Sequence, residues 1–371
     1  LMVSKTRKAA AQASYQQGQR KNMIYNGDMA ICQRSTEVTG IGNGDAGYHV
    51  QDRWQYYESG APASVVTMSQ STTSPDGFYS SLRLQCTTAS GTVNAADLVA
   101  LAQIFEGQDL QSINKGDAQA RAITVSFWVY TTKTGTYIVN MYDNDNTRAC
   151  SQSYTVSSSN TWEYKTVTFP PDTTGAFGDD ENASLYVYWG LVAGTDWTSG
   201  SLATAWESNN NPDRFTGQVD ALDSTSNNFY ITGVQMELGN TATDFQYESH
   251  AENLARCQRY YEDFPLGSYT ATGNSYATNA FVACQFPFRV TKRATPSLGH
   301  PTIGTSSGNV SATAATGSWI TTQPNDLLSS SSVAQGQIYI TASQSAAGLT
   351  DDSIMAIYQS GTGSFTFDSE L

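Results

Sequence analysis

The sequence predicts a mainly β protein: an N-terminal helix, an antiparallel β-sandwich, a short connector helix and a second, smaller β-sandwich. Three observations predict this class. Short runs rich in β-branched and aromatic residues recur along the chain, several alternate in polarity, and clusters of Gly, Asn, Asp or Ser bound them. The length of 371 residues suits two domains. A helical period replaces the strand pattern at residues 249–262.

Composition supports a folded protein with a weakly charged surface. Hydrophobic residues make up 39% and charged residues 14%, and the chain holds 21 Tyr, 14 Phe and 7 Trp. The aromatic residues supply a core, which argues against disorder. Such a surface is typical of extracellular or virion-type β proteins.

Charge divides the chain into a basic arm and an acidic body. Residues 1–21 contain no acid, are rich in Ala, Gln and Lys, and favour a helix. Their net charge is +5, so the rest of the chain carries −19. We expect the arm to anchor the protein to an acidic partner, although a solvated terminal helix is the alternative. The acidic body argues against a nucleic-acid-binding surface. The arm's basic residues are Lys5, Arg7, Lys8, Arg20 and Lys21.

The five cysteines form no pattern of a disulfide framework or a metal site. We expect reduced, mostly buried thiols, as in a protein that folds in a cytoplasm. No apolar run is long enough to predict a membrane span, and the first residues do not predict a secretion signal.

Residues 22–248 carry the first set of predicted strands. One run, residues 99–110, fits a helix or a strand followed by a loop equally well. Two long polar segments that bear aromatic residues, 169–184 and 194–218, are predicted loops, where binding residues commonly lie. The predicted strands lie within residues 48–58, 63–72, 80–88, 122–132, 136–142, 163–169, 183–191 and 228–237.

Residues 249–263 are predicted to form the connector helix. Ala251, Leu254, Ala255, Gln258 and Tyr261 share one helical face, and the preceding serine is a candidate N-cap. After this helix, residues 264–371 return to short strands separated by Gly- and Ser-rich turns, which predicts the second β-domain.

Several segments in order resemble a family of bacteriophage tail-fibre and receptor-binding proteins. They include "NMIYNGDMAICQRST", "YHVQDRWQYY", "ITVSFWVYTTKTGTYIVNMYD" and "GVQMELGNTATDFQYESHAENLARCQRYYE", within residues 22–263. The central part is also similar to jelly-roll carbohydrate-binding modules, in which an opening "NGD" strand pairs near a closing "VQLE" strand. The resemblance implies that the "VQMELG" segment closes the jelly roll and that "ATDFQYES" crosses its surface. It also implies a homotrimer.

No pattern predicts catalysis or a cofactor. His49, His250 and His300 are far apart in sequence and match no catalytic motif. Residues 142–146, "YDNDN", lack the remaining ligands of a calcium loop and predict a β-turn. The acids of residues 179–181 fit a solvated loop better than a glycosidase pair.

Carbohydrate binding is the function that the motifs favour. Sugar C–H faces stack on aromatic rings, and amides or carboxylates bind the hydroxyl groups. Trp54, Trp128, Trp162 and Trp189 lie within strand patterns, so we assign them to the core or a subunit interface. Polar segments hold the candidate sugar contacts, which are Trp197, Trp206, Asn209, Asn210 and Tyr142.

A structural calcium ion is a minor option, suggested by the likeness to carbohydrate modules. Its ligands would be Asp28, Asp52 and Glu237, and neutral hydrogen bonding is the alternative that we favour.

These observations leave several hypotheses. The first is a phage tail fibre or receptor-binding protein, made in the host cytoplasm, that attaches to the tail through its arm and contacts host glycan. The others are a capsid-attached fibre, knob or decoration protein, a glycan depolymerase, and a secreted carbohydrate-binding protein.

Overall fold

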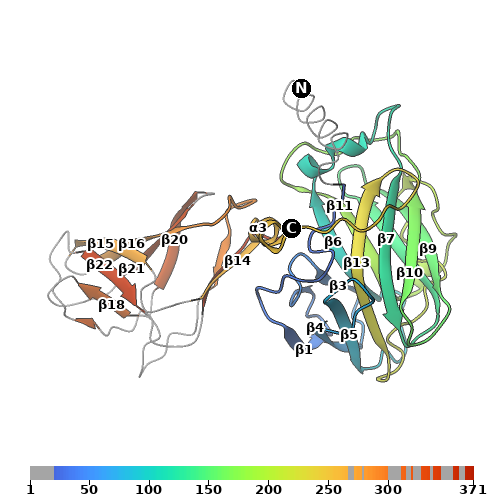
Figure 1. Cartoon of the computed structure of the whole chain (residues 1–371), viewed down its shortest axis with the longest axis horizontal. Helices are drawn as coiled ribbons and strands as arrows, with labels where there is room; N and C mark the ends of the chain where they lie inside the picture. The colour runs from blue at the N-terminus through green and yellow to red at the C-terminus, as the bar shows by residue number, and fades with distance from the viewer. Residues whose placement is uncertain are drawn as a thin grey trace. The chain divides into compact units, whose positions relative to one another are not determined.

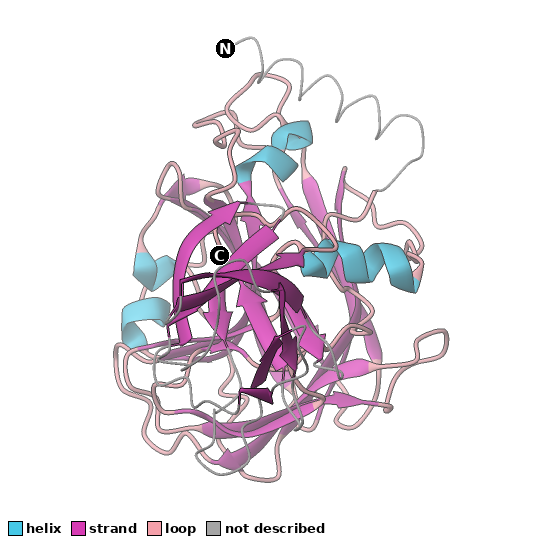
Figure 2. Ribbon diagram, turned by 90° about the vertical axis from the view of Figure 1, so that its left-hand side faces the viewer, coloured by secondary structure: helices cyan, strands magenta, loops and turns pink. Residues whose placement is uncertain are grey.

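The computed structural model describes residues 21–265, 271–277, 280–299, 311–314, 319–320, 327–334, 337–343, 354–358 and 364–371. The chain divides into two compact units between Asn253 and Leu254. The helix predicted for the N-terminal arm, with Lys5, Arg7, Lys8 and Arg20, lies outside the described residues. Strands far outnumber the few short helices (Figure 2).

The first unit is an antiparallel β-sandwich of two sheets (Figure 1). The chain crosses between the two sheets several times. Sheet A has the order β1 (Glu37–Gly42), β4 (Val65–Ser71), β5 (Ser81–Thr88), β13 (Asn228–Leu238), β7 (Ile123–Thr131) and β10 (Glu163–Phe169). Sheet B has the order β12 (Glu207–Ser208), β9 (Arg148–Val156), β8 (Gly135–Asp143), β11 (Ala183–Ala193), β6 (Leu98–Glu106), β3 (Gln55–Ser59) and β2 (Gly47–Tyr48).

The core between the sheets is aromatic. Trp54 and Trp189 are fully buried, and their ring centroids lie 5.1 Å apart. Phe127 of the opposite sheet approaches Trp189 edge-on at 6.2 Å and Tyr154 at 5.0 Å. Alternation along each strand directs these rings inward. The core assignment of Trp54 and Trp189 is therefore confirmed.

The strands predicted in the first unit are present, and three of its strands, β1, β9 and the two-residue β12, were not predicted. The ambiguous segment 99–110 forms strand β6 and then the 3₁₀ turns η1 (Gly107–Asp109) and η2 (Gln111–Ile113). Strands β1 and β9 were missed because their sequences, EVTGIG and RACSQSYTV, mix polar residues and glycine with few apolar ones. The predicted turn in "YDNDN" joins β8 to β9.

The ammonium group of Lys115 ties loops at one end of the sandwich together. Its Nζ lies 2.5 Å from Asp143 Oδ2 and 2.9 Å from Asp172 Oδ2, and all three side chains are nearly inaccessible to solvent. It also donates to the carbonyl oxygens of Thr174 and Gly175, both at 2.9 Å. Arg148 adds two hydrogen bonds to Asp172. Burial alone would raise the pKa of Asp172, but the Arg148 and Lys115 hydrogen bonds hold it below the usual value.

The connector helix is shorter than predicted. Helix α3 (His250–Gln258) begins with a capping box, in which Ser249 Oγ accepts from the Glu252 backbone N–H and donates to its carboxylate. Ser249 is thus an N-cap, as expected. The prediction of helix to residue 263 is wrong, because Tyr261–Pro265 forms strand β14, which pairs with β23 (Ser364–Asp368). Aromatic residues favour strands, and this pairing outweighs the helical period.

The described part of the second unit is also antiparallel. Strand β23 lies between β14 and β17 (Ser297–Gly299). Beside them Glu262 is fully buried, 2.7 Å from Lys292 Nζ and 3.1 Å from Arg289. The other sheet has the order β19 (Trp319–Ile320), β18 (Ser311–Ala314), β22 (Ile354–Tyr358), β15 (Ala271–Ala277), β16 (Ala280–Pro287), β21 (Gln337–Ser343) and β20 (Leu327–Ala334). That these two sheets form a sandwich stays a prediction.

The thiols agree with the sequence analysis where they are described. Cys32, Cys86, Cys150 and Cys257 are free, and all but Cys32 are buried. Burial raises the pKa of the Cys150 thiol to about 12, so it is unreactive at neutral pH. Within the described ranges, no helix has the length and apolar character needed to cross a bilayer.

Replacing the buried ammonium group tests how strongly these loops are held. Lys115→Met removes the cation paired with the buried Asp143 and leaves Asp172 with Arg148 alone, so we expect a loss of about 3–5 kcal/mol in unfolding free energy. The control is Lys133→Met, which breaks an ion pair whose side chains are 33% and 39% exposed, and should cost under about 1 kcal/mol. Urea unfolding of the full chain, followed by tryptophan fluorescence, compares them. Equal small losses would contradict a stabilising role for Lys115.

Candidate functional site

The solvent-facing side of sheet A carries a set of aromatic rings that we call the aromatic face: Trp128, Tyr130, Trp162, Tyr164 and Tyr230. In β7, Phe127 and Val129 point into the core, so Trp128 and Tyr130 point outward. Tyr164 lies opposite Trp128 and Tyr230 opposite Tyr130, with ring centroids 5.3 and 5.0 Å apart. Cross-strand pairing thus produces a continuous aromatic surface.

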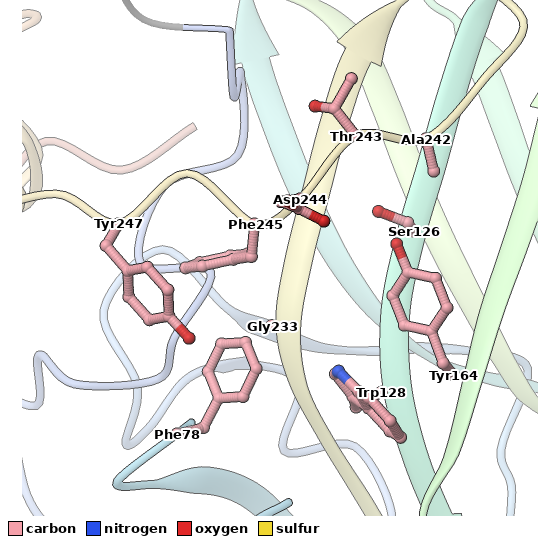
Figure 3. A pocket seen from close by; sticks show the side chains of 10 residues that line it. All are labelled: Phe78, Ser126, Trp128, Tyr164, Gly233, Ala242, Thr243, Asp244, Phe245 and Tyr247. Atoms are coloured by element: carbon pink, nitrogen blue, oxygen red, sulfur yellow. The ribbon is translucent and has the colours of Figure 1, made fainter. Parts of the chain in front are cut away.

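At one end the aromatic face forms a wall of a groove of about 550 Å³ (Figure 3). One wall is the pair Trp128 and Tyr164. The opposite wall is a packed trio, Phe78, Phe245 and Tyr247, with ring centroids 4.9–5.6 Å apart. We call this cavity the aromatic groove. Its other lining residues are Ser126, Gly233, Ala242, Thr243 and Asp244.

The floor of the groove depends on a β-bulge in β13. The register with β7 shifts between Thr232 and Gln235, and Gly233 between them has a φ of +61°. A Cβ on Gly233 would lie 2.6 Å from Cζ of Phe78. Glycine is therefore the residue that allows both this backbone conformation and the position of the Phe78 ring against it.

A strap, residues 239–248, crosses the outer side of sheet A and supplies Phe245 and Tyr247 (Figure 3). The buried side chains of Gln235 and Glu237 hold it. Glu237 accepts hydrogen bonds from the backbone N–H and the hydroxyl of Thr243, at 2.7 and 2.8 Å, and Gln235 accepts from the Gln246 N–H at 2.8 Å. The expectation that "ATDFQYES" crosses the sandwich surface is confirmed.

The opening segment, residues 22–28, forms hydrogen bonds with the other edge of β13 at the bulge. Val234 N–H donates to Gly27 O at 2.9 Å, and Met23 N–H donates to Met236 O at 2.9 Å. Asn22 adds hydrogen bonds from its side chain to both β13 residues. The "NGD" segment and the "VQME" strand therefore lie together, as the resemblance implied.

Oxygen atoms in the groove can bind hydroxyl groups. Ser126 contributes a hydroxyl, and the Asp244 carboxylate points into the cavity (Figure 3). Asp244 is exposed, and in the described part of the chain its carboxylate has no ion-pair partner. None of the ten lining residues is basic.

The prediction that Trp197 is an exposed sugar contact is wrong, because its side chain is buried. Helix α2 (Thr195–Thr198) turns its indole onto sheet B, where it is 8% exposed and donates from Nε1 to Ala96 O. It packs in a cluster with Phe215 and Tyr188, and the buried Arg214 guanidinium lies 5.2 Å from its ring. Its polar sequence neighbourhood was misleading, because segment 194–219 folds back over the sheet.

The other predicted contacts also bind the protein's own groups. Trp206 is half-buried, donates to Pro170 O at 2.9 Å and has Lys115 Nζ 5.3 Å from its ring. Tyr142 stacks on Arg214 at 4.9 Å. Asn209 and Asn210 bond Asn211 and Asp213. A sugar-binding role for these four residues stays a prediction, and they lie outside the aromatic groove.

The three acids of the calcium option do not form one ligand group in the described structure. No group of three metal-binding side chains occurs among them. Asp28 is bound by Asn253, Asp52 by Gln33, and Glu237 by Thr243, so each acid has its own donors on a separate segment. Of the predicted anchoring residues only Lys21 is described, and its backbone N–H donates to Gln246.

Trp128 and Trp162 were predicted to lie in the core or at a subunit interface. The prediction of a core position is wrong for both. Both are half-buried on the outer face of sheet A. The alternation in "ITVSFWVYT" was the available signal, because Phe127 inward requires Trp128 outward. No local pattern predicted the opposite wall of the groove, because Phe78 and Phe245 are separated by more than 160 residues in the sequence.

Comparisons with known proteins give distant structural likenesses. No family model matches the chain, and no curated protein matches it with significance. A domain of bacteriophage CBA120 tailspike protein 4, described as enzymatically active, is 14% identical over 58% of this chain and 21% of that one, with a TM-score of 0.30. A putative sugar-binding protein from Bacteroides thetaiotaomicron is 13% identical over 59% of this chain and 100% of that one, with a TM-score of 0.32. A family 4 carbohydrate-binding module is 11% identical over 58% and 99%, with a TM-score of 0.29.

A glycine substitution tests the geometry of the groove floor. Gly233→Ala adds a methyl group against Phe78, whereas Gly91 has nearly the same φ, +62°, and nothing within 4 Å of an added Cβ. Gly91→Ala should therefore cost only the backbone strain, about 1–2 kcal/mol. Gly233→Ala should cost a further 1–3 kcal/mol or so by overpacking. Chemical unfolding measures both, and equal losses would show that Phe78 does not rest on Gly233.

Proposed function

We propose that the first unit binds glycan in the aromatic groove. The observation that carries the proposal is the pair of facing aromatic walls, Trp128 with Tyr164 and the trio of Phe78, Phe245 and Tyr247, with oxygen groups between them. A pyranose ring has apolar C–H faces and a rim of hydroxyls. The walls match its faces, and the oxygen groups of Ser126 and Asp244 match its rim.

We propose binding without cleavage. A glycosidase needs two carboxylates roughly 5–9.5 Å apart around the scissile bond. Among the described residues that line the groove, Asp244 alone carries a carboxylate. Depolymerase activity remains the alternative from a different class, and release of reducing ends from a bound polysaccharide would support it.

We further propose that the chain is a structural protein of a bacteriophage virion, a tail fibre or receptor-binding protein that contacts host glycan. The resemblance of residues 22–263 and the contrast between a basic arm and an acidic body support this role. A capsid-attached fibre, knob or decoration protein is the alternative. In a homotrimer, three grooves would raise a weak single-site affinity through avidity.

Truncating the groove wall tests the binding proposal. Tyr164 is 44% exposed, so Tyr164→Ala should leave the melting temperature nearly unchanged. It should weaken glycan binding roughly tenfold through the lost stacking, and Trp128→Ala should do the same. The measurement is binding of the full chain to an array of bacterial surface polysaccharides. The control is Tyr79→Ala, which removes an 85% exposed ring that does not line the groove. Undiminished binding by both wall variants would reject the groove as the site.

Removing the arm tests attachment to the virion. A chain without residues 1–20 should keep the melting temperature of the full chain and lose only the arm's predicted helical contribution to the circular dichroism, because the first strand begins at Glu37. It should be missing from phage particles, as measured by immunoblotting purified virions. A second variant, with Gln at Lys5, Arg7 and Lys8, separates the role of charge from that of length. Normal incorporation of the truncated chain would contradict the anchoring role.

A further inference from the structure

We infer that the aromatic groove selects glycans that carry a protonated amino group, of which oligomers of 2-amino-2-deoxyglucose are the simplest. This inference rests on the proposed function and names the ligand class of the same site. It depends on a carboxylate without an ion-pair partner among the described residues, several aromatic rings and described lining residues of which none is basic.

Several aromatic clusters outside the core of the first unit contain a cation from the chain itself. Arg214 lies 4.9 Å from the ring centroid of Tyr142 and 5.4 Å from that of Tyr188. Lys115 lies 5.3 Å from the rings of both Phe177 and Trp206. Arg83 lies 5.6 Å from Tyr230, at the far end of the aromatic face. Ring faces attract cations, and these clusters satisfy that attraction internally.

The groove differs because its rings have no such cation. Among the described residues, no Lys or Arg lies over Phe78, Trp128, Tyr164, Phe245 or Tyr247. Asp244 adds a negative charge between the walls and has no ion-pair partner in the described chain. The ligand can therefore supply the cation, with its ammonium group beside Asp244 and against the ring faces.

The same charges disfavour acidic glycans. A uronate or phosphate group in the groove would face the Asp244 carboxylate and the negative faces of the rings, in a chain of net charge −14. A neutral N-acetylated sugar keeps the stacking and the hydroxyl contacts but loses the ionic contact. Affinity should thus fall from amino to N-acetylated to acidic sugars.

The test compares two tetrasaccharides with the same β-1,4 linkage, one of glucosamine and one of N-acetylglucosamine, by calorimetry with the full chain at mildly acidic pH and low salt. The amino tetrasaccharide should bind about two- to fivefold tighter, in the range of an exposed ion pair. Asp244→Asn should remove this preference and change affinity for the N-acetylated sugar less than about twofold. Asp117→Asn, an exposed acid outside the groove with the same change in net charge, should preserve the preference.

The outcomes separate the two proposals. If the N-acetylated sugar binds, Tyr164→Ala weakens it and no preference for the amine exists, selection by charge is wrong and glycan binding in the groove stands. A preference that survives Asp244→Asn also overturns the inference. If neither tetrasaccharide binds, the inference is wrong, and the polysaccharide array with Tyr164→Ala decides the proposed function separately.

Discussion

The bulge at Gly233 is the constraint on which the candidate site depends. Its positive φ changes the register of β13, so that Val234 reaches the opening segment through its backbone while Gln235 and Glu237 face the strap. Its missing side chain leaves room for Phe78. One residue thus sets the groove's floor, the position of one wall and the attachment of the strap. A β-bulge commonly re-aims side chains in this way.

The outer faces of the two sheets show how the fold leaves one surface open. Both carry aromatic rings, but segment 194–219 covers much of sheet B and buries Trp197, Phe215 and Arg214 against it. Burial lowers the pKa of the Arg214 guanidinium, which donates hydrogen bonds to Asn140 and packs against the surrounding rings. On sheet A the narrow strap covers only part of the aromatic face. Exposed aromatic area of this kind marks a binding surface more often than a structural one.

Sequence patterns predicted the fold better than the site, for physical reasons. Strand alternation is local, so the runs around Phe127 and Trp189 identified core strands correctly. The predicted end of the connector helix was wrong because β14 pairs with β23, about a hundred residues later, and a local sequence period cannot predict such a pairing. Trp197 failed because a polar segment can fold back onto a sheet. The bulge and the strap bring Phe78, Trp128 and Phe245 together in the groove. A single glycine in the sequence predicts neither the bulge nor the path of the strap.

The central claim is that a sugar ring sits between the two aromatic walls. A crystal structure of the full chain with a bound oligosaccharide tests it most directly. We expect a pyranose ring stacked on Trp128 or Tyr164, facing Phe245 and Tyr247, with a polar group within hydrogen-bond distance of Asp244. An oligosaccharide bound instead on sheet B near Tyr142 and Trp206, or between two carboxylates elsewhere in the chain, would contradict it.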